Sequence, residues 1–395
     1  MPRLLKGPAN KILERLIGLF LSAETSIINV LGRLRSKGMA DYHVEAALKR
    51  VQQTLQELRG DSWEYVPKMI QWEFYRHNPE MRRILESVEK HTRAYSSAQA
   101  LTITQTAIVE RLTENLMGEI VEATGHVETS LIDALRGIPI GRLEPDIFRE
   151  TGLSQVSAME ALGRGPISRV NEFVAVLERE GVTAFVDKTG RHWSLHTYGS
   201  MVLRTTSRQA EVLSVLTKDE EQDLYMITSH DTSCPICAPY EGRVYSRSGK
   251  DPVFPPLASA FGKIDPKGPN DLTNTYLNIH PNCIHALVPW TDTGKSPEQL
   301  EKIERFSNPK TNPFLVDPRS EKAREAYRRK EEGRRKWLAD YRQWERYKLV
   351  LGDKVPKTFQ TFQKHKLADD DKYKAWQSLY RRENAAIKEE QNGIS

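Results

Sequence analysis

A chain of 395 residues is long enough for two or three domains and for a sizeable buried core. Hydrophobic residues make up 38% and charged residues 28%, which excludes an intrinsically disordered chain, and three cysteines argue against an oxidised disulfide scaffold. The formal net charge of +5 is too small over this length to indicate nucleic-acid binding. The charge is unevenly placed, because residues 318–395 hold 21 Lys and Arg against 13 Asp and Glu, or +8 against −3 for the remainder. Such a tail suits contact with DNA or an acidic protein surface, or else forms a solvated charged helix.

Residues 1–137 are predicted to be helical, as a helical bundle or an elongated helical hairpin. The first apolar segment carries Leu13, Leu16, Ile17, Phe20 and Leu21 on one helical face. Charged residues interrupt it, so we expect neither a signal peptide nor a membrane-spanning helix, and no membrane partner. Further helices are expected over 41–60, 63–77, 79–95, 98–124 and 126–136, with breaks near Gly60, Pro79 and Gly125.

Residues 138–292 change in texture and predict an α+β domain. Short helices are expected over 154–162 and 166–180, followed by a β-hairpin within 181–198 and a helix over 196–216. Short strands are expected in "DLYMITSH", over 242–245 and over 286–290. Residues 293–395 are expected to form a Pro-broken connector and a basic helical tail, with Ser296 capping a helix, one long helix over 320–351, an interruption at Pro356 and a last helix over 373–388.

All three cysteines lie in two short segments that resemble the halves of a metal site. Cys234 and Cys237 form a CxxC turn, in which both sulfurs can face one ion about 2.3 Å away. About forty residues later, "HPNCIH" offers Cys283 with His280 and His285. Zinc takes four ligands, so we predict Cys234, Cys237, Cys283 and His280, because the Pro-Asn pair can turn His280 back beside Cys283. His285 is the alternative fourth ligand, and His230 is a weaker competitor.

A fully ligated zinc would join two distant loops and supply folding free energy on the order of 10 kcal/mol. The alternatives are a redox pair, which normally opens a helix in a thioredoxin-like βαβ pattern that is absent here, and simple packing of buried cysteines. Catalytic zinc would need an open position and a base. Asp231 and Glu241 flank the first pair, but neither belongs to an HExxH or deaminase pattern, so we predict a structural ion, with a zinc-dependent enzyme acting on nucleic acid as the alternative.

"DTSCPICAPYEGRVYS" together with "HPNCIHALVPWT" resembles the paired cysteine and histidine motif of phage head-morphogenesis proteins, the Mu F-like and SPP1-type minor head proteins. More narrowly, the chain resembles the phage minor capsid protein 2 family. The resemblance includes "GVTAFVDKTGRHWSLHTYGSMVLRTTSRQA" before the cysteines, and "NPKTNPFLVDPRSEKAREAYRRKEEGRRKW" and "VPKTFQTFQKHK" after them. The wider group commonly ends its second element in Cys-Arg-Cys, where this chain has His285 in the last position.

The resemblance implies a structural virion protein that is present in few copies and acts in head morphogenesis at or near the portal. It further implies assembly in the host cytoplasm, a place in the capsid interior or at the portal vertex, and partners among the portal and major capsid proteins. Contact with double-stranded DNA through the basic tail is the further expectation, because Arg319, Arg324, Arg328, Arg329, Arg334 and Arg335 recur before Trp337, Tyr341 and Trp344. The same aromatic spacing also suits packing of a helix face. The predicted fold is α+β and mostly α. We expect no enzymatic activity.

Overall fold

The computed structural model describes residues 8–36, 41–75, 101–135, 183, 185–186, 192–219, 221–261 and 278–392. Contacts between residues divide the chain into two compact units, each assembled from three stretches of sequence. We call Met1–Leu16, Ser62–Glu119 and Ser200–Gly333 the cysteine unit. We call Ile17–Asp61, Ile120–Gly199 and Arg334–Ser395 the tail unit.

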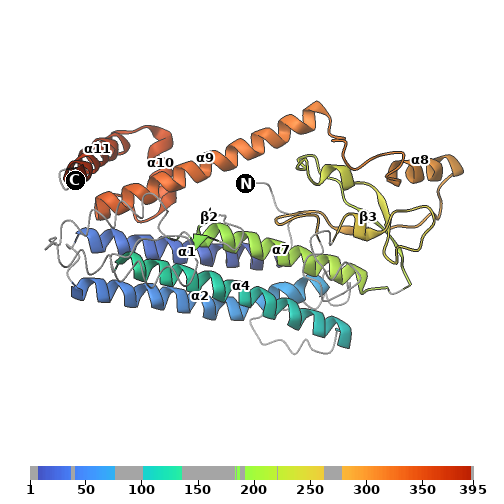
Figure 1. The fold of residues 1–395 in the computed structure, drawn as a ribbon, viewed down its shortest axis with the longest axis horizontal. Coiled ribbons are helices and arrows are strands. Elements are labelled where there is room, and N and C mark those ends of the chain that lie inside the picture. The colour runs from blue at the N-terminus through green and yellow to red at the C-terminus, as the bar shows by residue number, and fades with distance from the viewer. Residues whose placement is uncertain are drawn as a thin grey trace. The chain divides into compact units, whose positions relative to one another are not determined.

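The described residues are mostly helical and include a small antiparallel sheet, which confirms the predicted fold class (Figure 1). The helices are α1 (Pro8–Ser36), α2 (Asp41–Tyr75), α4 (Ile103–Leu135), α7 (Leu195–Leu216), α8 (Pro297–Ser307), α9 (Glu321–Leu351), α10 (Phe359–Ala368) and α11 (Asp371–Asn392). The strands are β1 (Phe185–Val186), β2 (His192–Trp193), β3 (Leu224–Ile227), β4 (Val244–Ser246) and β5 (Leu287–Pro289). Short 3₁₀ turns occur at η1 (Ala238–Tyr240), η2 (Leu257–Ser259) and η3 (Gly352–Lys354).

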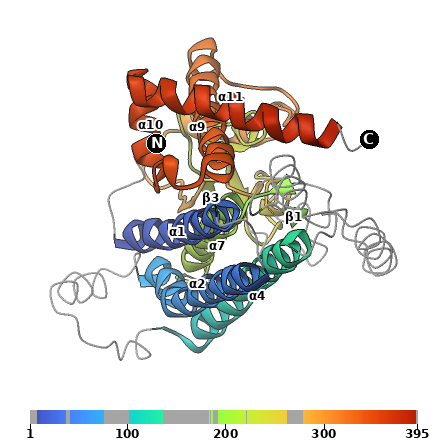
Figure 2. The same cartoon turned by 90° about the vertical axis from the view of Figure 1, so that its left-hand side faces the viewer.

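The core of the tail unit is built on the parts of α1, α2 and α4 that belong to it, which lie side by side in both views (Figures 1 and 2). Phe20, Ile27 and Leu31 of α1 are completely buried. Arg59 of α2 ties to α4, since its Nε donates to the Thr124 hydroxyl at 2.7 Å. The predicted amphipathic helix is thus a core helix of this unit.

Two predicted helix breaks are wrong. Gly60 and Gly125 lie inside α2 and α4, which run on to Tyr75 and Leu135. Glycine inside a helix costs about 1 kcal/mol relative to alanine, and burial of apolar neighbours such as Leu58 and Val66 offsets that cost. Even Pro67 is accommodated inside α2.

The three-stranded sheet of the cysteine unit has the order β4-β3-β5, with both neighbours antiparallel to β3. Its buried core holds Val244, Phe254 and Trp290, and Leu300 and Ile303 of α8 pack against it. The predicted hairpin is also confirmed, because β1 pairs antiparallel with β2. The helix predicted over 196–216 corresponds to α7.

Helix α8 begins where its cap was predicted. Ser296 starts α8 with a capping box, in which Ser296 and Gln299 each bond the other's backbone N–H. The long helix α9 ends before η3 and Pro356, as predicted. The short helix α10 was not predicted; its N-cap is Thr358, whose hydroxyl accepts from Thr361 N–H.

By length and composition, Lys11–Leu34 could cross a membrane, but 44% of its most apolar window is buried inside the protein. A core helix passes the same test, and the buried side chains of α1 match that explanation. The helices predicted over 79–95, 154–162 and 166–180 lie outside the described residues. The division at 137 and 292 into three domains remains a prediction.

Candidate metal centre

The register of the sheet brings the two cysteine segments together. Ile227 at the end of β3 pairs with Leu287 at the start of β5, and Met226 pairs with Val244 at the start of β4. The loop that follows β3 and the loop that precedes β5 therefore leave from the same end of the sheet. Cysteines separated by more than forty positions meet there.

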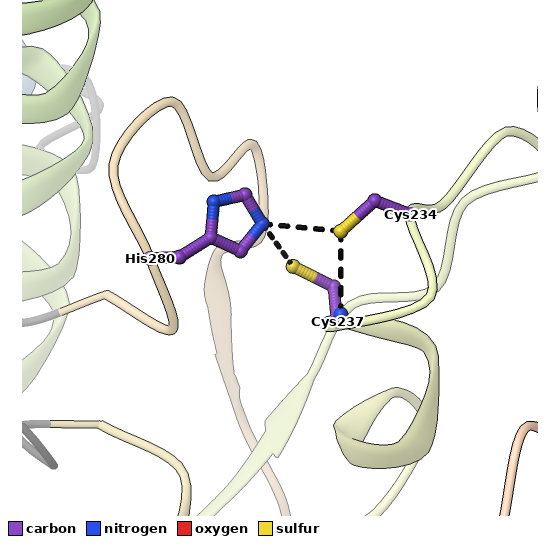
Figure 3. Close-up of side chains that lie close together, drawn as sticks. All are labelled: Cys234, Cys237 and His280. Atoms are coloured by element: carbon purple, nitrogen blue, oxygen red, sulfur yellow. Dashed lines mark hydrogen bonds between the residues drawn. The ribbon is translucent and has the colours of Figure 1, made fainter. Parts of the chain in front are cut away.

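The first pair and His280 form one group of donor atoms (Figure 3). The Nε2 atom of His280 lies 3.1 Å from Cys234 Sγ and 2.9 Å from Cys237 Sγ. The backbone N–H of Cys237 donates to Cys234 Sγ at 3.4 Å, which fixes the tight CxxC turn. The other ring nitrogen of His280, Nδ1, lies 2.6 Å from the Pro281 carbonyl oxygen, which leaves Nε2 to face the sulfurs.

Cys283 and His285 form a second group that shares Cys237 with the first. The sulfurs of Cys237 and Cys283 are 3.8 Å apart, and His285 Nδ1 lies 3.3 Å from Cys283 Sγ. The predicted Pro-Asn turn is present, since Cys283 N–H donates to the His280 carbonyl at 3.0 Å and Asn282 adopts a φ of 64°. All five predicted donors thus gather at one end of the sheet.

The donor set fits a zinc ion. Two thiolates about 2.3 Å from one ion in tetrahedral geometry lie about 3.8 Å apart, which is the separation of Cys237 Sγ and Cys283 Sγ. Three sulfurs with one imidazole nitrogen would make a Cys₃His set, a combination typical of structural zinc, and the structure gathers these donors in two groups that share Cys237. Cys237 and Cys283 expose only 1% and 2% of their surface, so the centre is closed to solvent on that side.

Hydrogen bonds within the cluster favour the metal-binding form of the outer thiols. A hydrogen bond with Cys237 lowers the pKa of Cys234 to about 4, even though burial opposes the shift. A hydrogen bond with Cys237 also holds the pKa of Cys283 well below its ordinary value. The pKa of Cys237 itself is raised, because its thiol is hydrogen-bonded to the sulfurs of Cys234 and Cys283. Both lowered pKa values favour the thiolate, the form that ligates metals.

Glu241 stands behind His285. Its Oε1 accepts a hydrogen bond from the His285 Nε2–H group, from the Ser233 hydroxyl, and at 3.1 Å from the His230 backbone N–H. Burial alone would raise the pKa of Glu241, but these bonds outweigh burial and lower it. Burial likewise acts to lower the pKa of His285, yet its bonds to Cys283 and Glu241 raise it to about 9. From the sequence alone, Glu241 is recognised only as a residue that flanks Cys234 and Cys237.

The ring of His230 is placed outside both donor groups. Its Nε2 lies 3.3 Å from the Thr228 hydroxyl, and its ring meets that of His285 edge to face at 4.8 Å. His230, the weaker competitor for the fourth ligand position, therefore lies beside the cluster and in neither donor group.

The connector between α8 and α9 is fastened to the cysteine loop. Arg319 donates through Nη1 to the Ser233 carbonyl at 3.0 Å and pairs with Asp317 through two further bonds near 2.9 Å. Arg243, 1% exposed, donates to the Asn312 carbonyl at 2.6 Å. Arg319, which the sequence groups with the basic residues of the tail, lies before α9 begins at Glu321 and anchors this connector.

The aromatic residues of α9 pack within the tail unit. Trp337 and Tyr341 stack with ring centroids 5.3 Å apart, and both meet Phe359 edge to face. Trp344 is completely buried and Tyr341 is 3% exposed. Of the two explanations offered by their spacing, packing of a helix face is the one that the structure shows.

Comparison with known proteins agrees with the motif set. Residues 16–346 match the family model of phage minor capsid protein 2. The chain is also 24% identical over 298 residues to a structural protein of Lactococcus phage LL-H, covering 71% of this chain and 73% of that protein. No solved structure matches. Because the family match extends from α1 through the cysteine cluster and most of α9, the chain belongs to the phage minor capsid protein 2 family, whose members are structural proteins of the phage particle.

Proposed function

We propose that the protein is a minor head protein that acts in head morphogenesis at or near the portal, in the capsid interior or at the portal vertex. The observation that carries this proposal is the family match across residues 16–346, which includes both cysteine segments and the helices around them. Assembly would take place in the host cytoplasm, where thiols stay reduced and available to a metal.

The portal and the major capsid protein are the partners that the proposal names. Cross-linking of purified heads followed by mass spectrometry tests it directly. We expect cross-links between exposed lysines of this chain and the portal protein. Cross-links confined to the major capsid lattice would contradict the portal placement and leave a general role in the head.

The metal part of the proposal is one structural zinc ion held by Cys234, Cys237, Cys283 and His280, with His285 as the alternative fourth ligand. Bound there, zinc would join the loop after β3 to the loop before β5. The burial of Cys283 and His285, at 2% and 1% exposure, supports a structural ion rather than a reaction centre.

Elemental analysis of the purified protein tests the metal. We expect about one zinc per chain, as for a four-ligand structural site, and loss of zinc together with cooperative unfolding in Cys237→Ser, because Cys237 belongs to both donor groups. His230→Ala is the matched control and should keep its zinc. Comparison of His280→Ala with His285→Ala then identifies the fourth ligand, since loss of the ligand should weaken zinc binding more than loss of the other histidine.

Absence of enzymatic activity is part of the same proposal. The competing function is a zinc-dependent enzyme that acts on nucleic acid, and the row Cys283, His285 and Glu241 is the arrangement that would serve it. Zinc-loaded protein incubated with DNA or RNA decides between them. Turnover that His285→Ala abolishes while folding is retained would replace the structural function with the catalytic one.

A further inference from the structure

We propose that Glu241 is the positioning residue of the metal centre: through His285, Ser233 and His230 it holds the two cysteine loops in register. This inference rests on the metal part of the proposed function. It adds a residue that supplies no ligand atom to the predicted set but that determines whether the donor atoms converge.

The position of Glu241 in the chain suits this role. It follows η1, four residues after Cys237, and lies just before β4. Its carboxylate reaches back to the loop between β3 and the first cysteine, where it accepts from the Ser233 hydroxyl and from the His230 N–H. Both partners flank Cys234 on its N-terminal side, so Glu241 closes the loop that presents the CxxC turn.

The same carboxylate oxygen also bonds the second loop. His285 donates from Nε2 to Glu241 Oε1, and its other nitrogen, Nδ1, lies 3.3 Å from Cys283 Sγ. Glu241 therefore joins both loops through protein hydrogen bonds alone, in parallel with the bridge that the ion would make. His285 exposes only 1% of its surface, so water does not compete for this bond from outside.

The hydrogen bond to Glu241 also determines which ring nitrogen of His285 points toward the sulfur of Cys283. With Nε2 committed to the carboxylate, the ring is held with Nδ1 toward Cys283. Outer carboxylates that orient a histidine in this way are common around metal sites, and their loss typically weakens metal binding about 10–100-fold. The negative charge of Glu241 lies beside a cluster that must receive a dication, which adds a favourable electrostatic contribution.

The test is zinc affinity measured by competition with a chromogenic chelator in the full-length chain. We expect Glu241→Ala to bind zinc about 10–100-fold more weakly than the wild type. Glu241→Gln retains the shape and an acceptor oxygen, so it should fold normally and lose about 10-fold. Asp231→Asn is the matched control, because Asp231 is an exposed carboxylate on the same loop and its loss removes the same charge.

Cobalt substitution supplies a readout that a purely structural role would leave unchanged. The visible absorption of bound Co²⁺ reports ligand geometry, and we expect its bands to shift in Glu241→Gln and not in Asp231→Asn. Equal zinc affinity and identical cobalt spectra in Glu241→Gln and the wild type would overturn the positioning role alone. Failure of the wild type to bind zinc or cobalt would overturn the metal centre as well, and so separates the two proposals.

Discussion

Lys348, near the end of α9, is a charged side chain with no exposed surface. Its ammonium group donates to the carbonyl oxygens of Gly352 at 2.9 Å and Val355 at 3.1 Å, and lies 3.4 Å from Asp353 Oδ1. Burial lowers the pKa of Lys348, although Asp353 partly counters that shift. The ammonium thus ties the end of α9 to the turn after it, where the Gly352 carbonyl also accepts from the Val355 N–H at 3.3 Å.

The backbone at Lys348 also lies in close contact with α1. A Cβ atom added at Gly32 would lie 2.7 Å from the Lys348 carbonyl oxygen, so α1 approaches the end of α9 at a distance that only glycine permits. Gly18, on the same helix, has no heavy atom within 4 Å of its would-be Cβ. Close packing therefore requires a glycine at position 32, whereas the space at Gly18 would admit a side chain.

We predict that Gly32→Ala lowers the free energy of unfolding by about 1–3 kcal/mol, because backbone must shift to admit the methyl group. Gly18→Ala is the control, and we expect it to raise that free energy by up to about 1 kcal/mol through helix propensity. Urea denaturation followed by circular dichroism measures both. Equal effects of the two substitutions would contradict the close approach at Gly32.

At the scale of elements, α1 and α9 each bring a buried carboxyl group into the tail unit. Glu24 is completely buried, and its Oε2 accepts from the Thr183 hydroxyl at 2.9 Å and from His196 N–H, in the first turn of α7, at 2.8 Å. Glu345 of α9 is 8% exposed. Burial raises the pKa of Glu345 well above its ordinary value, and the nearby charge of Glu24 adds to the shift, while Arg342 and Arg346 oppose it.

This raised pKa predicts a pH dependence of stability. The folded state keeps a proton on Glu345 at pH values where the unfolded chain has lost it, so stability is fully present below the ordinary pKa and falls as the pH rises through the raised one. Glu345→Gln should therefore raise the melting temperature at pH 7.5 and weaken its dependence on pH between 5 and 7.5. Glu332→Gln, on an exposed face of the same helix, should behave as wild type.

Local sequence signals such as caps and turns predicted an element correctly where distant packing did not oppose them. Ser296 with Gln299 marked the start of α8, and the Pro-Asn pair marked the turn before Cys283. Gly60 and Gly125 misled because the packing of neighbouring apolar residues outweighs the propensity of one glycine. The helix α10 was missed because its signal is one Thr358 cap followed by a short, mostly polar run.

The candidate site was predictable as far as residue types and spacing reach. Thiols and imidazoles announce a metal by their chemistry, so the five donors could be named from the sequence. Glu241 and Arg319 could not, because glutamates and arginines are common and their roles come from contacts across many residues. The bonds from Glu241 to His285 and from Arg319 to the Ser233 carbonyl span 44 and 86 positions.

At the scale of the whole molecule, the positive charge of the tail is partly paired. Arg328 and Arg329 form ion pairs with Glu325 at 2.7 and 3.0 Å, whereas Arg335 and Lys336 are exposed further along α9. Exposed ion pairs of this kind contribute little to stability, but they reduce the charge that is available to phosphates. Any contact with DNA should therefore depend more on the second pair of basic residues than on the first.

We predict that the full-length protein binds duplex DNA with an affinity that falls as salt rises. Replacing Arg335 and Lys336 with Gln should reduce the slope of log affinity against log salt by up to about 2, because each phosphate contact contributes about 0.9. The control replaces Arg328 and Arg329 with Gln, which removes the same charge from paired positions. Fluorescence anisotropy over a salt series measures the slopes, and salt-independent or absent binding would remove DNA from the partners.

The connector between α8 and α9 has a mechanical consequence. Arg319 is separated from the start of α9 by a single residue, and it is bonded to the carbonyl of Ser233, the residue before Cys234. The loop that presents the first thiol and the entry into a 31-residue helix are therefore one joint. An ion held by Cys234 would therefore also restrain the residues that lead into α9.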